Sequence, residues 1–320
     1  MILPELTLAR VFDEDSSWVA TLSGQRVRTL IATGDVIPAR TVNFKTIEQD
    51  DWMWPYAETA EFLSQADITV INLETPLLRE CTPTNEGMIF CGDGRHVEGL
   101  QASGVDVATV GNNHFGNYGQ AGVTETVKIL TGAGIEVTGL GEPALVEIDG
   151  IMFGFLAYND VGVSEASVAS ADNLTVVEDI VGVRSEADVV VVAFHWGEEY
   201  RLMPTWRQEE LAHLAVDSGA DLVLGNHPHW IQPVEIYNGK TIVYAHGNFV
   251  FDQMWSRETR EGVVGKYTFF DNNLIDVDFY PILIESYGQP FFLTGLEREN
   301  ILKRMKEASE SLKMEAKLSD

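Results

Sequence analysis

The sequence predicts an α/β protein in which helices cover central sheets. Three observations lead to this fold class. Short apolar runs of strand length alternate with segments that carry an apolar stripe at helical spacing. Two strong hairpin signals, Asp149-Gly150 and Asn238-Gly239, interrupt that alternation. With 320 residues, of which 45% are hydrophobic, the chain is long enough to bury a large core.

The first half of the chain alternates between expected strands and expected helices. Strands are expected at VRTLIATGD, ITVINLE, VDVATV and IEVTGL. Helices are expected over 55–65, 96–103 and 119–132, the last with Val123, Val127 and Leu130 on one face. The run LVEIDGIMFGFLAY is expected to form a hairpin, because Asp149-Gly150 stands between two apolar segments.

The second half of the chain shows the same alternation of expected strands and expected helices. Helices are expected over 173–186 and 205–218. DVVVVAFH is continuously apolar, which is typical of a strand buried on both faces, and ADLVLG is the next strand. Asn238-Gly239 joins IQPVEIY to KTIVYAHGNFVF in a second hairpin, and the segment 262–295 is β-rich.

These elements divide the chain into three expected parts. Residues 1–27 form a lead-in that is irregular apart from one strand at 18–22, and residues 28–296 form a single domain. Residues 297–320 form a C-terminal amphipathic helix, expected to dock on its own domain. Its apolar stripe consists of Ile301, Met305, Ala308, Leu312 and Ala316.

The charge of the chain limits its partners. It carries 21 basic and 49 acidic residues, a formal net charge of −28. Such an excess disfavours nucleic acid and other partners held through a polyanionic backbone. An anionic substrate would need a local cation, which a bound metal would supply.

No transmembrane segment is expected, because no apolar run reaches the roughly 18 residues that a spanning helix needs. The N-terminus also lacks the basic start, apolar run and cleavage site of a secretory signal. If the protein is exported, we expect its signal or anchor to lie outside this sequence.

Two cysteines, Cys81 and Cys91, lie in the loop-like stretch between Pro76 and His96. A disulfide that closes this loop in an oxidising compartment is one interpretation, and two separate thiols are the other. The sequence alone leaves both open.

Five of the seven histidines follow apolar runs that are expected strands. They are His114, His195, His227, His229 and His246. Loops at the carboxyl ends of strands converge on the ligand site in α/β folds, and histidine is the commonest metal ligand. The pattern therefore predicts a metal centre.

Oxygen ligands and other polar side chains occupy loops of the same kind. They are Asp35, Arg40, Asn72, Glu74, Asn112, Asn113, Glu198, Asn248 and Asp252. A mixed oxygen and nitrogen set suits one or two divalent ions of the Mn, Zn, Fe, Co or Ni class. Because no cysteine belongs to the set, a structural zinc knuckle is disfavoured.

The pair His227 and His229 has a geometric consequence. If this segment is extended, residues two apart face the same side and reach one metal ion or two adjacent ions. Pro228 biases His227 towards that extended conformation.

Other residues near these loops have two interpretations each. Arg40 is expected to hold a carboxylate or phosphate of the substrate, the alternative being an ordinary surface position. Trp196 and Trp230 flank the ligand loops and either cover the site from the core or stack on a substrate. His96 and His213 fall on expected helices and are expected to be structural.

The motifs GD-x4-R, NLE, GNNH, HWG, GNHPH and GNF-x-FDQ, in this order, resemble the CapA family of bacterial capsule synthesis proteins. That family includes PgsA of poly-γ-glutamate synthesis and is similar to the calcineurin-like metallophosphoesterases. The resemblance covers residues 28 to 255. It implies a four-layer αββα sandwich of the metallo-dependent phosphatase type, with a metal site at the strand ends.

The resemblance also implies roles for residues at matching positions. It implies metal ligands at Asp35, Glu74, Asn113, His195, His227 and His229. Glu74 stands where the phosphoesterases have a bridging Asp, and His114 matches the His that protonates a leaving group. Arg40 and His246 are the other expected catalytic residues, and the expected substrate contacts are Arg40, Asn72, Trp196 and Asn248.

The chain departs from these patterns at three places. The phosphoesterases open with Asp-x-His, whereas Val36 and Ile37 follow Asp35 here, so one ligand is absent. The bridging group is the longer Glu74 or the neighbouring Asn72. Before Gly247 the family commonly has Ser, whereas this chain has His246, which is an extra ligand, an acid or base, or a hydrogen-bonding replacement.

The expected function is that of a CapA-like metal-dependent protein of capsule or poly-γ-glutamate synthesis, acting as a hydrolase on an anionic phosphoester or peptide. One alternative is a non-catalytic, metal-binding accessory subunit of a membrane polymer synthase. Another is a peptide epimerase that uses the same site. Expected partners are an anionic polymer or phosphorylated substrate and a membrane synthase complex, and the resemblance implies an extracytoplasmic, membrane-associated location.

Overall fold

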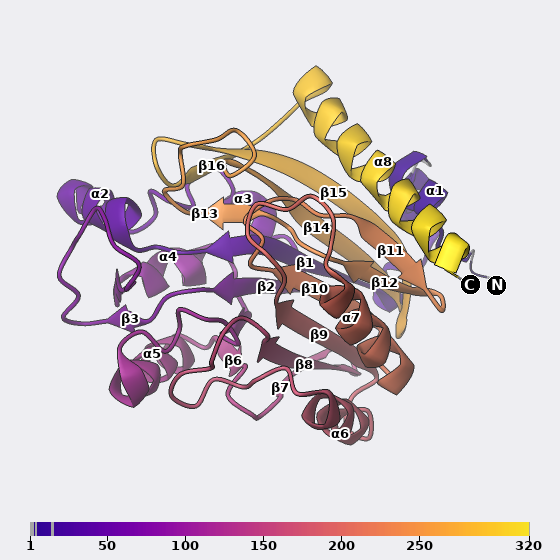
Figure 1. Ribbon diagram of the computed structural model, residues 1–320, viewed down its shortest axis with the longest axis horizontal. Coiled ribbons are helices and arrows are strands. Elements are labelled where there is room, and N and C mark those ends of the chain that lie inside the picture. The colour runs from indigo at the N-terminus through magenta and orange to yellow at the C-terminus, as the bar shows by residue number, and fades with distance from the viewer. Residues whose placement is uncertain (1–2, 4, 14–15, 320) are drawn as a thin grey trace.

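Two β-sheets pack face to face between layers of helices in the computed structural model, which describes residues 3, 5–13 and 16–319 (Figure 1). The eight-stranded sheet has the order β16-β15-β14-β1-β2-β5-β6, and β13 pairs with β1. Its strands are β1 (Val27–Val36), β2 (Ile68–Leu73), β5 (Val107–Thr109), β6 (Glu136–Thr138), β13 (Asn248–Val250), β14 (Glu261–Phe270), β15 (Asn273–Glu285) and β16 (Gln289–Phe292).

The second sheet has six strands in the order β11-β12-β10-β9-β8-β7. They are β7 (Ala144–Ile148), β8 (Ile151–Asn159), β9 (Val189–His195), β10 (Leu222–Asn226), β11 (Val234–Tyr237) and β12 (Lys240–Val243). A further parallel pair, β3 (Leu77–Leu78) and β4 (Gly92–Asp93), lies on either side of the cysteine loop.

Helices cover the outer face of each sheet. The eight-stranded sheet is covered by α2 (Arg40–Gln49), α3 (Ala60–Leu63), α4 (His96–Ala102) and α5 (Gly119–Gly132). The six-stranded sheet is covered by α6 (Asn173–Val183) and α7 (Trp206–Ser218). Successive side chains of β1 point to opposite faces of the sheet. Leu30 and Ala32 lie in the core between the sheets, whereas Ile31 packs against the helices. The predicted αββα sandwich is therefore confirmed.

The C-terminal helix α8 (Gly295–Ser319) lies beside α1 (Leu8–Asp13) (Figure 1). Of its expected apolar stripe, Ile301, Met305, Ala308 and Leu312 are buried within the chain. The side chain of Ala316 lies outside the described residues. The helix thus closes the edge of the core between the sheets.

Several expected elements differ from the structure. Of the helix expected over 55–65, only the short α3 forms. The backbone before α3 makes hydrogen bonds between residues three apart, such as Tyr56 N–H to Met53 O, and these form turns. Helix α2 was not expected from the sequence. The strand expected at 18–22 is replaced by a 3-10 helix, η1 (Ser16–Thr21), which is followed by a second one, η2 (Gly24–Arg26).

The run KTIVYAHGNFVF is not one strand. Its first part is β12 in the six-stranded sheet, and its last part is β13, which pairs with β1 in the other sheet. The chain crosses at Gly247, whose φ of 75° suits glycine. A Cβ on Gly34 would lie 2.1 Å from the carbonyl oxygen of Gly247, so glycine is needed for this approach.

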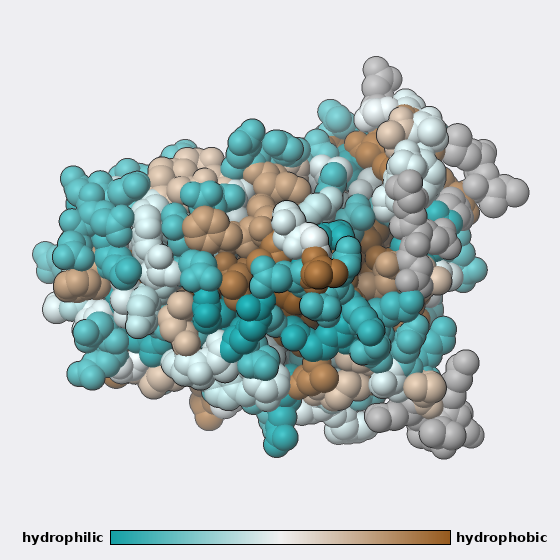
Figure 2. All heavy atoms as spheres, turned by 90° about the horizontal axis from the view of Figure 1, so that it is seen from above, coloured by the Kyte–Doolittle hydropathy of each residue, from teal (hydrophilic) through white to brown (hydrophobic). Residues whose placement is uncertain are grey.

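No described helix is long and apolar enough to cross a membrane. Figure 2 shows one face of the molecule, on which hydrophilic side chains surround several hydrophobic ones near the middle of the view.

Candidate metal centre

The register of the parallel strands brings the predicted ligands together at one edge of each sheet. In the eight-stranded sheet, Asp35 pairs with Asn72 of β2 and with Asn248 of β13. In the six-stranded sheet, His195 pairs with Asn226. Because the carboxyl ends of both sets of strands lie at the same end of the sandwich, their side chains meet between the sheets.

Glu74 lies where these side chains meet. It belongs to two groups of ligand atoms that lie within 4.8 Å of one another: Asp35, Glu74 and His195, and Glu74, His227 and His229. All of these residues are buried. Burial by itself would raise the pKa of Glu74, but the neighbouring imidazoles, His195 first among them, lower this pKa to about 2. The carboxylate is therefore ionised and common to both groups.

Several buried polar atoms in this region have no hydrogen-bond partner in the described part of the chain. They are both carboxylate oxygens of Glu74, Oδ1 of Asn113, Nε2 of His195, Oδ1 of Asn226 and Nδ1 of His227. His195 Nε2 lies 3.3 Å from Glu74 Oε1, but the pair lacks hydrogen-bond geometry. Buried acceptors without donors are costly, and a cation would satisfy them together.

The imidazole of His229 is oriented by two oxygens. Its Nδ1 lies 3.0 Å from Asp35 Oδ2 and 2.8 Å from Asn248 Oδ1, so Nδ1 donates and Nε2 is left for a ligand. Burial would lower the pKa of His229, but Asp35 and Glu74 outweigh it and raise this pKa to about 9. Burial lowers the pKa of His227 well below its ordinary value.

The His-Pro-His segment is not extended as the sequence predicts. His227 has φ 96° and His229 has φ 55°, both in the left-handed region that non-glycine residues rarely adopt. The expectation of an extended His227 was wrong, because tertiary contacts override the local bias from Pro228. The two rings nevertheless lie together, with centroids 5.8 Å apart. Such backbone strain is typical of functional sites.

His114, in the loop after β5, lies close enough to the cluster to interact with Glu74, His195 and His229. His114 Nδ1 lies 3.1 Å from Asn117 Oδ1, and its ring packs on Phe90 with centroids 4.2 Å apart. Burial lowers the pKa of His114, and the nearby Glu74 carboxylate opposes that shift. Asn72 donates to Asp35 Oδ1 at 2.8 Å, and thus orients a predicted metal ligand.

Arg40 is already engaged within the protein. Its guanidinium forms an ion pair with Asp252, donates to the carbonyl oxygen of Gly87 at 3.2 Å, and lies over the rings of Phe90 and Phe251. A substrate anion would therefore have to share this guanidinium with Asp252.

Two residues predicted for the site are bonded elsewhere. His246 is fully buried, with Nδ1 3.1 Å from the carbonyl oxygen of Gly225 and Nε2 2.9 Å from the hydroxyl of Tyr267. Trp196 is also fully buried, and its indole N–H donates to the carbonyl oxygen of Tyr244 at 2.8 Å. A substrate contact by Trp196 does not fit this position, and the bonds of His246 fit a hydrogen-bonding role.

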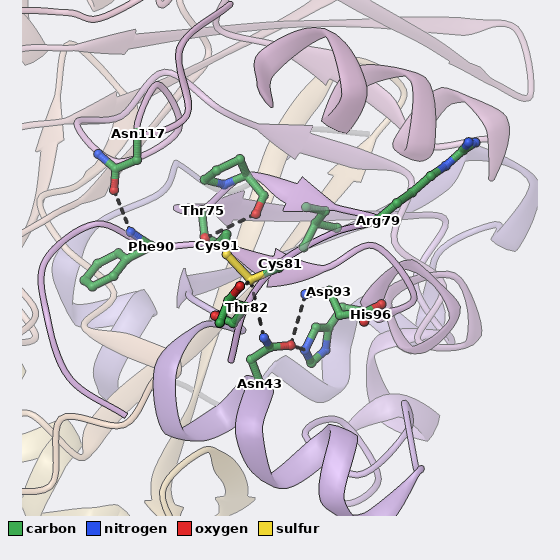
Figure 3. The surroundings of a disulfide bond; sticks show 12 residues. Asn43, Thr75, Arg79, Cys81, Thr82, Phe90, Cys91, Asp93, His96 and Asn117 are labelled. Carbon is green, nitrogen blue, oxygen red and sulfur yellow. Dashed lines mark hydrogen bonds between the residues drawn. A yellow bond between two sulfur atoms is a disulfide. The ribbon is translucent and has the colours of Figure 1, made fainter. Parts of the chain in front are cut away.

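The structure also brings residues to this region that the sequence analysis did not select. Asn226 ends β10 beside His195, and Asn117 contacts His114. The sequence held a signal for both, since each stands within three residues of a predicted site histidine. The two cysteines form a disulfide, with Cα atoms 5.8 Å apart (Figure 3).

The donor set fits a divalent metal ion. Carboxylate oxygens and imidazole nitrogens converge, and several of these atoms lack a hydrogen-bond partner among the described residues. Together, the double-sheet sandwich and this cluster at its strand ends define the class, which is the metallo-dependent phosphatase type of fold.

Comparison with known proteins agrees with this class. A solved phosphatase from Mycoplasma pneumoniae superimposes with a TM-score of 0.55 at 13% identity, over 82% of this chain and 95% of that one. Residues 29–253 match the family described as bacterial capsule synthesis protein PGA_cap, and the chain belongs to that family.

Two relatives carry related names. The chain is 27% identical to the capsule biosynthesis protein CapA of Bacillus anthracis, over 87% of this chain and 72% of that protein. It is 29% identical to the PGA biosynthesis protein CapA of Bacillus subtilis (strain 168), over 85% of this chain and 76% of that protein. The resemblance seen in the motifs is therefore confirmed.

Proposed function

We propose that the protein is a metal-dependent hydrolase that acts on an anionic phosphoester or peptide during synthesis of a capsule or poly-γ-glutamate. The observation that carries this proposal is the group of buried, unpartnered ligand atoms around Glu74. The names of the relatives supply the biological setting.

In this proposal, the metal ligands are Asp35, Glu74, Asn113, His195, His227 and His229, as the motifs predict. A bound divalent cation would polarise the scissile group and make water a better nucleophile. Glu74 serves both ligand groups, which suits two adjacent ions as well as one. Asn72 and Asn248 orient Asp35 and His229 through the hydrogen bonds described above.

The chain's own residues supply the remaining steps. Nε2 of His114 gives a proton to the leaving group, because Nδ1 is held by Asn117. Arg40 attracts the anionic substrate while it stays anchored by Asp252. His246, bonded on both sides, supports the fold beneath the site.

An assay with defined metals tests the proposal. The metal-free protein is loaded with Mn, Zn, Co or Ni and assayed on phosphomonoesters, phosphodiesters and γ-glutamyl peptides. We expect turnover with at least one metal. His114→Ala should lower kcat about 100-fold or more with metal content retained, as for loss of a general acid. His195→Ala should lower both metal content and activity.

His213→Ala is the matched control, because this histidine of α7 pairs with Glu235 of β11 and belongs to neither ligand group. Activity that survives both site substitutions would refute the proposal. Metal binding without turnover on any ester or peptide would instead favour the accessory-subunit alternative. Deuterium uptake from heavy water into an intact peptide would favour the epimerase.

A further inference from the structure

Asn117 occupies a position between His114 and the loop closed by the disulfide. Its Oδ1 lies 2.8 Å from the backbone nitrogen of Phe90 (Figure 3). The same oxygen lies 3.1 Å from Nδ1 of His114. Phe90 in turn packs its buried ring against the imidazole of His114. One side-chain oxygen thus joins a candidate catalytic imidazole to a covalently closed loop.

The chemistry of these bonds fixes the tautomer of His114. A backbone N–H can only donate, so the Asn117 atom that meets Phe90 N must be the carbonyl oxygen. That same oxygen can only accept from His114, so Nδ1 of His114 carries a proton. The imidazole then exchanges its other proton at Nε2, the ring nitrogen that has no hydrogen bond to the described residues.

The loop that supplies Phe90 is held at several points. The disulfide joins Cys81 to Cys91, directly after Phe90, and Arg40 donates to the carbonyl oxygen of Gly87. The N–H of Phe90 therefore has a fixed position. It keeps Asn117 oriented independently of any substrate.

We propose that Asn117 is a positioning residue, which holds the imidazole of His114 in the Nδ1–H tautomer with Nε2 available for proton transfer. This inference rests on the proposed function, in which His114 acts on the leaving group. Asn117 itself touches neither substrate nor metal. It acts through His114 by fixing the direction and the tautomer of that ring.

The first test measures the tautomer directly. Nitrogen-15 spectra of histidine-labelled, zinc-loaded protein report the protonated ring nitrogen, and the His114 signal is the one lost in His114→Gln. We expect the Nδ1–H form in the wild type and in Asn117→Asp, which keeps an acceptor oxygen. Asn117→Leu should shift His114 to a mixture or to the Nε2–H form. An unchanged tautomer in Asn117→Leu would overturn the inference.

The second test measures proton transfer. Asn117→Leu should lower kcat about 10- to 100-fold on an alkyl ester, whose leaving group needs a proton, and much less on a p-nitrophenyl ester. KM and metal content should not change, and Asn117→Asp should restore most of the rate. An equal loss on both esters would show a merely structural role and would overturn the inference.

Gln120→Leu is the matched control, since this nearby amide on α5 contacts Ser167 and not His114. Failure of the proposed function would give a result different from failure of the role proposed for Asn117. The wild type would then hydrolyse neither ester, while the tautomer measurement would still accept or reject the role of Asn117.

Discussion

Glu74 shows most directly why the cluster is suited to a cation. Its carboxylate is fully buried, it is ionised, and neither oxygen has a hydrogen-bond partner among the described residues. A buried charge without a partner is strongly destabilising. Adjacent imidazoles reduce that cost, and a divalent cation coordinated by the same oxygens would remove more of it.

Substitution of His246 distinguishes a structural role from ligation. Burial lowers the pKa of this histidine to about 4, so the ring is neutral, donates from Nδ1 to Gly225 and accepts from Tyr267. His246→Ala should lower the free energy of unfolding by about 1–3 kcal/mol for each group left unpaired. Metal content, measured by mass spectrometry, should stay at the wild-type level.

Tyr267→Phe is the paired control for His246. It removes one of the two bonds and should destabilise less than His246→Ala, again with metal retained. Loss of metal from the folded His246→Ala protein would instead identify this histidine as a ligand.

The histidine His96 makes the stability of the protein depend on acid pH. Burial lowers its pKa from the ordinary 6.5 to about 3, and the nearby Arg95 guanidinium adds to this shift against the opposing charge of Asp93. Nε2 donates to Asn43 Oδ1, whereas Nδ1 has no hydrogen-bond partner among the described residues (Figure 3). Between these two pKa values, His96 is therefore protonated in the unfolded chain and neutral in the folded protein. Stability due to neutral His96 is complete above pH 6.5 and falls between 6.5 and 3, by up to about 1.4 kcal/mol per pH unit.

Denaturant unfolding at a series of pH values checks this dependence. The difference in free energy of unfolding between wild type and His96→Gln should change between pH 6.5 and 3 and be flat above pH 7. His213→Gln should show the opposite sign, because Glu235 outweighs burial and raises the pKa of His213. The stability that the interaction of His213 with Glu235 contributes is complete below the ordinary pKa of histidine. It is lost as the pH rises through the pKa that His213 has in the folded protein. A flat difference for His96→Gln at acid pH would contradict the assignment.

Among the structural elements, the loop between β3 and β4 depends on its disulfide. The Cys81–Cys91 bond closes a loop with a sequence separation of 10, and this loop contains the exposed Met88 and Ile89. Replacement of both cysteines by serine should lower the free energy of unfolding by roughly 2–3 kcal/mol, chiefly because the unfolded chain gains freedom. Guanidinium unfolding of oxidised protein measures the change.

The reduced wild type provides the control for the cysteine substitutions. It should unfold at the same denaturant concentration as the double serine variant, since both lack the bond. Equal stability of oxidised and reduced wild type would show that the disulfide adds nothing to the fold.

Elements with a strong periodic pattern were predicted closely. The helix over 119–132, the hairpin at Asp149-Gly150 and the buried strand β9 agree with the structure, because apolar spacing and turn residues act locally. The segment after Asp51 was predicted poorly. Its aromatic residues Trp52 and Tyr56 are buried by tertiary packing in turns, which a helical pattern does not anticipate.

On the scale of the complete chain, the site exists because two sheets end at the same place. Asp35 and Asn72 come from one sheet, and His195 and Asn226 come from the other. The core between the sheets holds these edges in register, with side chains such as Val70, Phe155 and Leu224. The site therefore depends on the packing of the whole sandwich.

The sequence alone predicted the α/β fold class and the polar residues at strand ends that are the candidate ligands. These follow from local patterns, namely apolar periodicity and polar residues placed directly after buried strands. Only the tertiary structure decided which of those residues meet. It directed His246 and Trp196 into hydrogen bonds of the core, placed Asn117 against His114, and closed the disulfide. The physical reason is that side-chain direction and hydrogen-bond partners depend on neighbours distant in sequence, which a linear pattern does not specify.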